Sequence, residues 1–144
     1  MGNSAQIDTF PYMIKIPTRW RDNDVYGHVN NVVYYSFFDT AVNTHLIEEG
    51  GLDIHHAPII GVVVETRCEF KKELTFPEAV RAGIRVTKLG RTSVTYEIAL
   101  FGKDGNEPAA TGHFVHVYID RESRRPVPVP DGIRKALEPI TTSE

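Results

Sequence analysis

Residues 21–51, RDNDVYGHVNNVVYYSFFDTAVNTHLIEEGG, decide how the rest of the chain is interpreted. A polar segment with Gly27 comes first and holds two asparagines suited to cap a helix, because asparagine oxygens accept hydrogen bonds from the free N–H groups at a helix start. Apolar residues then recur at helical spacing up to Gly50 and Gly51, where glycine tolerates the left-handed conformation that ends helices. We therefore expect a helix that begins near Asn31. Its apolar residues cover most of its circumference, which favours a helix enclosed by other elements.

The segments on either side of this helix predict strands. Residues 12–19 alternate between apolar and polar side chains, and from residue 59 onward the period is two. Glycine-containing turns divide the second part into four strands, and a short helix is expected near 131–138. A curved antiparallel sheet wrapped around one long central helix buries that helix most economically, so we expect a single α+β domain over residues 1–144. The unpaired sheet edges favour a homo-oligomer, either a dimer or a homotetramer.

Composition excludes several classes of function. With 144 residues, 41% of them hydrophobic, the chain can bury a core without disulfides or metals. A net charge of -3 and a pI near 6.1 lack the basic surplus that nucleic-acid binding requires. Residues 1–10 lack the pattern of a signal peptide, and no apolar run approaches the ~20 residues of a membrane span. Since Cys68 is the only cysteine, a reducing compartment and a cytoplasmic location are expected.

Metal and cofactor binding are not expected, although the chain has six histidines. His113 and His116 are three apart on a predicted strand and therefore point to opposite faces. His55 and His56 are adjacent in a loop without further ligands at metal spacing. Cys68 falls on the apolar face of its strand and is predicted to be a core residue rather than a nucleophile.

A motif in the opening segment resembles a known family. Asp24, Gly27, His28, Val29, Asn30, Asn31 and Tyr34 spell Asp-x-x-Gly-His-Val-Asn-Asn-x-x-Tyr. This segment is similar to that of the 4-hydroxybenzoyl-CoA thioesterase family of hotdog enzymes, which includes long-chain acyl-CoA thioesterases. A weaker likeness continues through VTKLGRTSVTYEI (86–98) and RRPVPVP (124–130). The resemblance implies the hotdog fold and hydrolysis of a fatty or aromatic acyl-CoA to the free acid and CoA.

The resemblance makes Asp24 the catalytic carboxylate, acting as nucleophile or as general base on water. The chemistry is plausible by itself, because a thiolate whose conjugate acid has a pKa of about 8.5 can leave without a strong general acid. One carboxylate and an oxyanion site then suffice, and the chain contains no Gly-x-Ser-x-Gly elbow. The structural alternative is that Asp24 only braces a polar turn.

Other residues complete the expected catalytic set. His28 and Asn30 either orient the acyl group and water or cap the helix, whereas Asn31 is favoured as the cap. In the family a backbone N–H near Gly61 polarises the thioester carbonyl. Ile60 and Val62 remain equally open for this role, and a glycine that eases a β-bulge is the structural alternative.

The expected substrate-binding residues are more dispersed. Tyr34 lines the acyl pocket or belongs to the core, and Asp39 is the second candidate carboxylate, with a structural or pocket-lining role favoured. The resemblance implies that CoA is bound near Arg91, Thr92 and Ser93, with Arg124 and Arg125 available for the phosphates. The alternative is that these arginines are simply solvated.

Two other functions fit the same fold, because a fold alone does not determine function. A non-catalytic acyl-CoA-binding hotdog protein would bind CoA esters without releasing thiol. Hydratase or dehydratase chemistry would change the unsaturation of the acyl chain instead. The segment RDNDVYGHVNN, residues 21–31, favours hydrolysis.

Overall fold

The structure is a computed structural model that describes residues 7–142, so most of the segment judged for a signal peptide lies outside it. One antiparallel sheet has the strand order β1-β3-β4-β5-β2. Its strands are β1 (Tyr12–Ile16), β2 (Ile59–Phe70), β3 (Val80–Leu89), β4 (Ser93–Phe101) and β5 (Ala110–Asp120). The helices are α1 (Asn31–Glu48) and α2 (Asp131–Leu137), with the 3-10 turns η2 (Ile7–Thr9), η3 (Trp20–Asp22) and η4 (Glu138–Ile140). None of the helices in residues 7–142 is long and apolar enough to cross a membrane.

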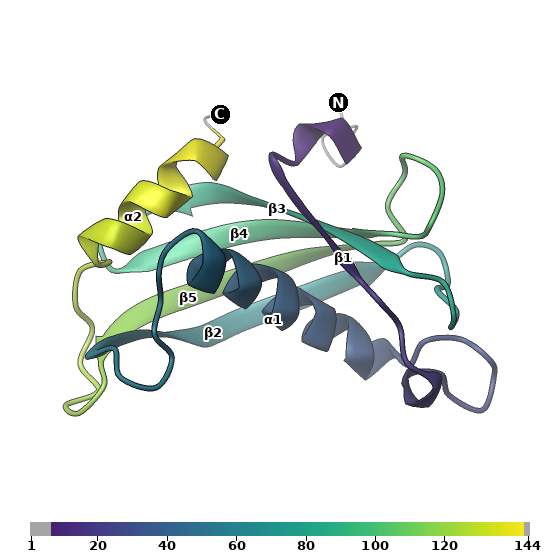
Figure 1. Cartoon of the computed structure of the whole chain (residues 1–144), viewed down its shortest axis with the longest axis horizontal. Coiled ribbons are helices and arrows are strands. Elements are labelled where there is room, and N and C mark those ends of the chain that lie inside the picture. Colours follow the sequence, from purple (N-terminus) through teal and green to yellow (C-terminus); the bar gives the residue numbers. More distant parts are fainter. Residues whose placement is uncertain (1–6, 143–144) are drawn as a thin grey trace.

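Helix α1 lies across one face of the sheet (Figure 1). The side that packs on the sheet is buried and consists of Tyr34, Phe37, Phe38, Ala41, Val42, His45 and Leu46. Contact with β5 is so close that a Cβ on Gly112 would overlap the ring of Phe38. The opposite side of α1 remains open, and Val32 is 69% exposed. The predicted helix is therefore confirmed, but within one chain it is covered on one side rather than enclosed.

The α+β class is confirmed, and the arrangement is compatible with the hotdog fold. Strands β1 and β2 form the two edges of the sheet. Strand β2 has a β-bulge between Val63 and Glu65, which inserts one extra residue relative to β5. Because of this residue, Cys68 faces the core opposite Gly112, whereas Val62 points to the other face. The regular period of two that was expected from residue 59 onward is therefore interrupted at this bulge.

Individual side chains on the sheet agree with other predictions. Cys68 packs against the core, and burial raises the pKa of its thiol to about 11. His116 is buried on the α1 side of the sheet. His113 lies on the other side, 3.6 Å from Glu65. The two histidines thus face opposite ways, as expected.

Candidate active site

Two aspartates in the loop before α1 have different surroundings. Asp22 is only 1% exposed and accepts hydrogen bonds from Arg19, from the backbone N at 2.7 Å, from Nε at 3.1 Å and from Nη2 at 2.9 Å. Its backbone oxygen accepts from the Asn30 backbone N at 2.8 Å. Both carboxylate oxygens of Asp22 are therefore used to hold the loop against the start of α1.

Asp24, two residues later, is half-buried and keeps one oxygen available. Its Oδ1 accepts from the Tyr26 backbone N at 2.9 Å, and its backbone N donates to the His28 oxygen at 2.9 Å. Gly27 closes this turn with a φ of 86°, a left-handed value that suits glycine. Asp24 Oδ2 has no hydrogen-bond partner within residues 7–142. Asp24 therefore braces the turn, as the structural alternative supposed, but only through one of its two oxygens.

Asp24 lines a cavity of about 570 Å³ beside the N-terminus of α1. The cavity is also lined by Tyr26, His28, Val29, Asn31, Tyr34, Phe70, Lys71, Lys72 and Glu73. The structure thus brings together Asp24, His28 and Tyr34 of the predicted set. His28 Nε2 lies 3.1 Å from Glu73 Oε1 on one wall, and both side chains are exposed to solvent.

The residues that follow β2 were not predicted to belong to this site. Lys71 and Lys72 reach it because both of their backbone N–H groups donate to the Ala109 oxygen, at 2.8 and 2.9 Å. No local pattern indicates this placement, since it depends on the end of β2 lying beside the start of α1. The two lysines share the cavity with the carboxylates of Asp24 and Glu73, and Lys71 Nζ lies 3.5 Å from Glu69 Oε1.

Two predicted residues at the start of α1 have structural roles. Asn30 is the N-cap, because its Oδ1 accepts from the Val32 backbone N at 3.1 Å. The expectation that Asn31 is the cap was wrong by one residue, and Asn31 lines the cavity instead. Tyr34 is buried against Phe70, with ring centroids 5.0 Å apart, and burial raises the pKa of its hydroxyl. Tyr34 therefore belongs to both the core and the cavity wall.

Gly61 presents its backbone to the open edge of the sheet. The Arg121 backbone N donates to the Pro58 oxygen at 2.8 Å, so this pair is a hydrogen-bonded one. Pairs alternate along an antiparallel ladder, so Ile60 and Val62 also bond to β5, whereas the N–H of Gly61 points away from it. Among the three alternatives, only Gly61 has a free N–H, and the β-bulge lies further along the strand.

Gly61 and Asp24 lie at opposite ends of α1 within one chain. Gly61 lines a cavity with Leu46, near the C-terminal end of the helix. The Asp24 cavity begins at the N-terminal end, and the helix rises roughly 24 Å from Asn30 to Leu46. One chain therefore does not place the two groups at a common carbonyl.

The residues expected to bind CoA lie at the Gly61 end. Thr92 accepts from the Tyr118 backbone N at 2.8 Å, and the Asp120 backbone N donates to the Arg125 oxygen at 2.9 Å. These bonds bring the β3–β4 turn (Arg91, Thr92, Ser93) and the loop with Arg124 and Arg125 to the same end of β5. Arg91, Arg124 and Arg125 are exposed there.

Asp39 does not line the Asp24 cavity. It lies on the outer side of α1, where partial burial raises the pKa of its carboxyl.

Comparison with known proteins gives consistent results. The model of the thioesterase-like superfamily matches residues 18–137. The crystal structure of the PA5185 protein from Pseudomonas aeruginosa strain PAO1 is 49% identical, with a TM-score of 0.93 over 95% of this chain and 96% of that one. A thioesterase from Thermus thermophilus, solved with coenzyme A and Zn, is 28% identical, with a TM-score of 0.76 over 91% and 94% of the two chains. The protein YsmA of Bacillus subtilis (strain 168) is 24% identical over 129 residues, 90% of this chain and 86% of YsmA.

Proposed function

Since the chain belongs to the thioesterase-like superfamily, we propose that it hydrolyses a fatty or aromatic acyl-CoA thioester through the Asp24 carboxylate. The observation that carries this proposal is the free Oδ2 of Asp24, in a cavity of about 570 Å³ at the start of α1. The neighbouring Asp22 has both oxygens bonded to Arg19 and cannot serve. Asp24 is thus the carboxylate of this loop that is free to react.

The reaction requires few groups. Asp24 Oδ2 either attacks the carbonyl carbon or removes a proton from a water molecule that attacks it. Attack forms a C–O bond and moves the carbonyl π electrons onto oxygen; when the carbonyl re-forms, the C–S bond breaks and its electron pair leaves on the CoA sulfur as a thiolate. If Asp24 is the nucleophile, a water molecule then hydrolyses the acyl anhydride and restores the carboxylate; if Asp24 is the base, the proton that it took passes to the thiolate or to solvent. The N-terminus of α1 stabilises negative charge nearby. His28, held by Glu73, orients the water or the acyl carbonyl.

The oxyanion donor comes from a second copy of the chain in this proposal. Two β2 strands can pair antiparallel about a twofold axis at their free edges. Pairing confined to the middle of the strand, with Val62 opposite Arg67, leaves Gly61 just outside the paired stretch with its N–H unused, and brings it to the level of Cys68, two residues from the wall of the Asp24 cavity. The free N–H of Gly61 of the partner subunit then lies near the thioester carbonyl.

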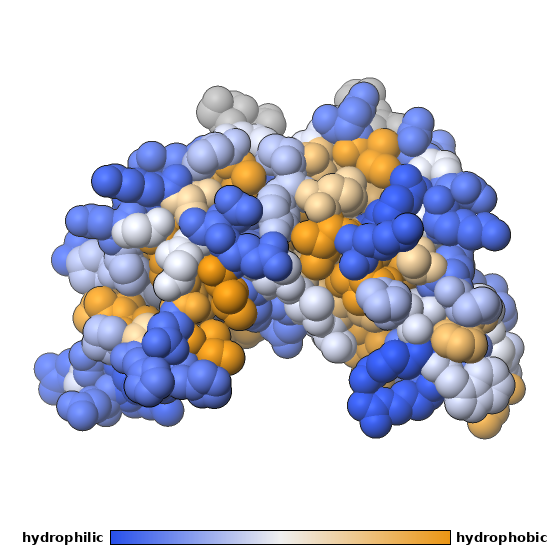
Figure 2. Space-filling view, in the orientation of Figure 1, coloured by the Kyte–Doolittle hydropathy of each residue, from blue (hydrophilic) through white to orange (hydrophobic). Residues whose placement is uncertain are grey.

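Exposed apolar side chains support this pairing. Val63 and Val64 on β2 are 42% and 57% exposed, and Val32 on α1 is more exposed still. Figure 2 shows hydrophobic residues gathered in groups over the face that carries α1. A long unpaired edge flanked by apolar side chains is stabilised when a second strand covers it. The same pairing would bring Arg124 and Arg125 of the partner subunit towards this copy's Asp24, where the CoA phosphates could bind. The CoA complex of the Thermus thermophilus relative supports CoA as the thiol.

Replacing Asp24 with Asn tests the proposal. The variant keeps an acceptor for the Tyr26 N–H, so the fold should persist while thiol release from acyl-CoA falls by about three orders of magnitude. Asp39→Asn is the matched control and should retain most of the activity. Unreduced thiol release by Asp24→Asn, or its loss in Asp39→Asn, would contradict the assignment. Tight binding of CoA esters by the wild type without thiol release would instead support a non-catalytic binding protein.

A further inference from the structure

The turn that carries Asp24 ends in two exposed residues, Val25 and Tyr26, which we call the apex. Their side chains are 93% and 81% exposed, although one is aliphatic and the other aromatic. The turn itself is closed, because the Asp24 oxygen accepts from the Gly27 backbone N at 3.1 Å and Asp24 Oδ1 from the Tyr26 backbone N. Exposed side chains on a rigid turn lose little conformational entropy when a partner covers them. The apex is therefore suited to anchor a contact.

A groove at the other end of α1 offers a complementary surface. It lies between the C-terminal half of the helix and the start of β2, beside Gly61. Four aliphatic and two polar side chains form its walls: Leu46, Leu52, Ile54, Ile60, Asn43 and Arg121. A buried tyrosine hydroxyl usually finds a hydrogen-bond partner, and the two polar side chains can supply one. We call this surface the Gly61 groove.

The apex does not reach the groove of its own chain, because α1 rises roughly 24 Å between the two. The proposed β2 pairing brings them together between copies, since its register puts Phe70 level with Ile59 of the partner subunit. Tyr26 and Phe70 line the same cavity, and Ile59 is next to Ile60 of the groove. We propose that the apex of each copy docks in the Gly61 groove of the other. The inference rests on the β2 pairing of the proposed function and adds a second contact between the copies.

The apex and the groove lie on the same face of the sheet, the face that carries α1. A twofold axis perpendicular to the sheet keeps that face common to both copies. In Figure 1 the loop before α1 and the loop after it both reach past β2, the edge at which the copies pair. The loop with the apex of one copy therefore meets the loop beside the groove of the other.

The paired strands alone make too small a contact for a stable dimer. Pairing over residues 62–67 uses six residues of each copy, whereas a specific interface uses about 20 to 30 residues a side. Two apex contacts, one at each end of the twofold interface, enlarge it and cover apolar side chains that are exposed in one chain. Aromatic anchors seated in apolar pockets supply much of the binding energy of such interfaces.

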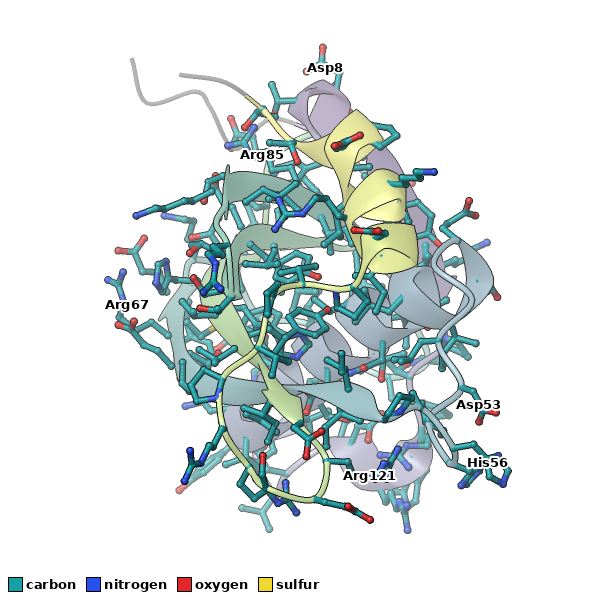
Figure 3. All side chains as sticks on the ribbon, turned by 90° about the vertical axis from the view of Figure 1, so that its left-hand side faces the viewer. Asp8, Asp53, His56, Arg67, Arg85 and Arg121 are labelled. Carbon is teal, nitrogen blue, oxygen red and sulfur yellow. The ribbon has the colours of Figure 1, made fainter. Side chains whose placement is uncertain are left out.

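The rim of the Gly61 groove is held in place by Arg121. Its Nε donates to the Ala57 oxygen at 2.8 Å and its Nη2 to the Ile54 oxygen at 2.9 Å. Figure 3 shows Arg121 directed towards the loop that carries Asp53 and His56. The Ile54 side chain is 51% exposed, so a partner can contact it. A rigid apex and a rigid rim need little rearrangement to associate.

Sedimentation equilibrium of single and double variants tests the contact. Tyr26→Ser removes the ring from an exposed position, so the monomer fold should persist while the dimer dissociation constant rises at least about tenfold. Ile54→Ser should have a similar effect from the groove side. The double variant should lose less binding free energy than the sum of the two, because each single change already breaks the same contact. Where the dimer is too tight to dissociate measurably, the rate of subunit exchange replaces the dissociation constant.

Trp20→Ser is the matched control. Trp20 lies in η3, just before the turn, and is 76% exposed, but it packs against Phe76 of its own chain, with ring centroids 5.9 Å apart. Its effect on the dissociation constant should therefore add to that of Ile54→Ser without coupling.

The outcomes separate this inference from the proposed hydrolysis, because none of these measurements requires thiol release. Coupling between Tyr26 and Ile54 supports the contact even if no acyl-CoA is hydrolysed. An unchanged dissociation constant in Tyr26→Ser, additive effects of the two changes, or a wild type that remains monomeric would overturn it. Binding of the wild type to phospholipid vesicles that is lost in Tyr26→Ser, with the dimer unchanged, would assign the apex to a membrane surface instead.

Discussion

In the proposed reaction, the two ends of α1 supply different groups. The N-terminal end carries the Asp24 carboxylate, a roomy cavity and the cationic side chains of Lys71 and Lys72. The C-terminal end carries the outward N–H of Gly61, a small apolar cavity and exposed arginines. Neither end contains both a reacting group and an oxyanion donor. If the proposal holds, the catalytic site is divided along the chain and is completed when unlike ends of two copies meet.

The strongest test of this division combines two variants, one that lacks the Asp24 carboxylate and one that lacks the Gly61 N–H, in the same dimer. Asp24→Asn removes the carboxylate, and Gly61→Pro removes the N–H without removing a bond to β5. Each variant alone should be nearly inactive. Refolded together at equal amounts, they should recover about a quarter of wild-type thiol release, because half of the dimers then hold one intact site. No recovery would mean that each site is built within one chain.

A control separates the N–H of Gly61 from its lack of a side chain. Gly61→Ala introduces the same close contacts with His116 and Tyr118 but keeps the N–H. It should therefore be far more active than Gly61→Pro while having a similar melting temperature. Equal inactivity of the two variants would assign the effect to packing.

We expect acid to lower the stability of the protein through His116, whose side chain lies beside Gly61. This side chain is 2% exposed, and burial lowers its pKa from 6.5 to about 4. The unfolded chain takes up a proton below pH 6.5 and the folded chain does not, so stability falls between pH 6.5 and pH 4 and levels off below that. The loss amounts to at most about 3 kcal/mol. Urea unfolding of wild type and His116→Gln at pH 7, 5 and 4 should show a smaller decline in the variant, and parallel declines would contradict this role.

At the Asp24 end, we expect Asp22 to matter for stability and Asp24 for activity, and the stability change is smaller than the one in acid. Asp22→Asn weakens the buried bonds to Arg19 and should lower the free energy of unfolding by about 2 kcal/mol. Asp24→Asn should leave that free energy nearly unchanged and remove activity instead. Chemical denaturation and thiol release, measured on both variants, check this reversal. Equal loss of stability in the two would show that Asp24 also has a mainly structural role.

Much of the fold could be predicted because its patterns are local. Helical spacing up to Gly50 gave α1 within about two residues at its end, and alternation gave the strands from Ile59 onward. The choice between Asn30 and Asn31 as cap could not be made, since adjacent residues of the same type differ only in backbone geometry. The β-bulge in β2 was also hidden, because an extra residue is visible only against the partner strand.

The site residues that belong to the sequence motif could be predicted, and the other site residues could not. Asp24, His28 and Tyr34 follow from one segment and meet in one cavity. Lys71 and Lys72 depend on contacts between segments about 40 residues apart in the sequence, for which the chain carries no local signal. The choice of Gly61 over Ile60 and Val62 required the hydrogen-bond direction in the ladder.

The two edges of the sheet differ in how they guard against uncontrolled growth. Strand β1 has five residues, is bracketed by Pro11 and Pro17, and exposes Lys15, three features that discourage another strand from joining. Strand β2 has twelve residues and no proline. If two copies join through β2, the only edge left is the guarded one. Assembly would then stop at a closed particle instead of extending into a filament, so the edge that completes the chemistry would also protect the protein from aggregation.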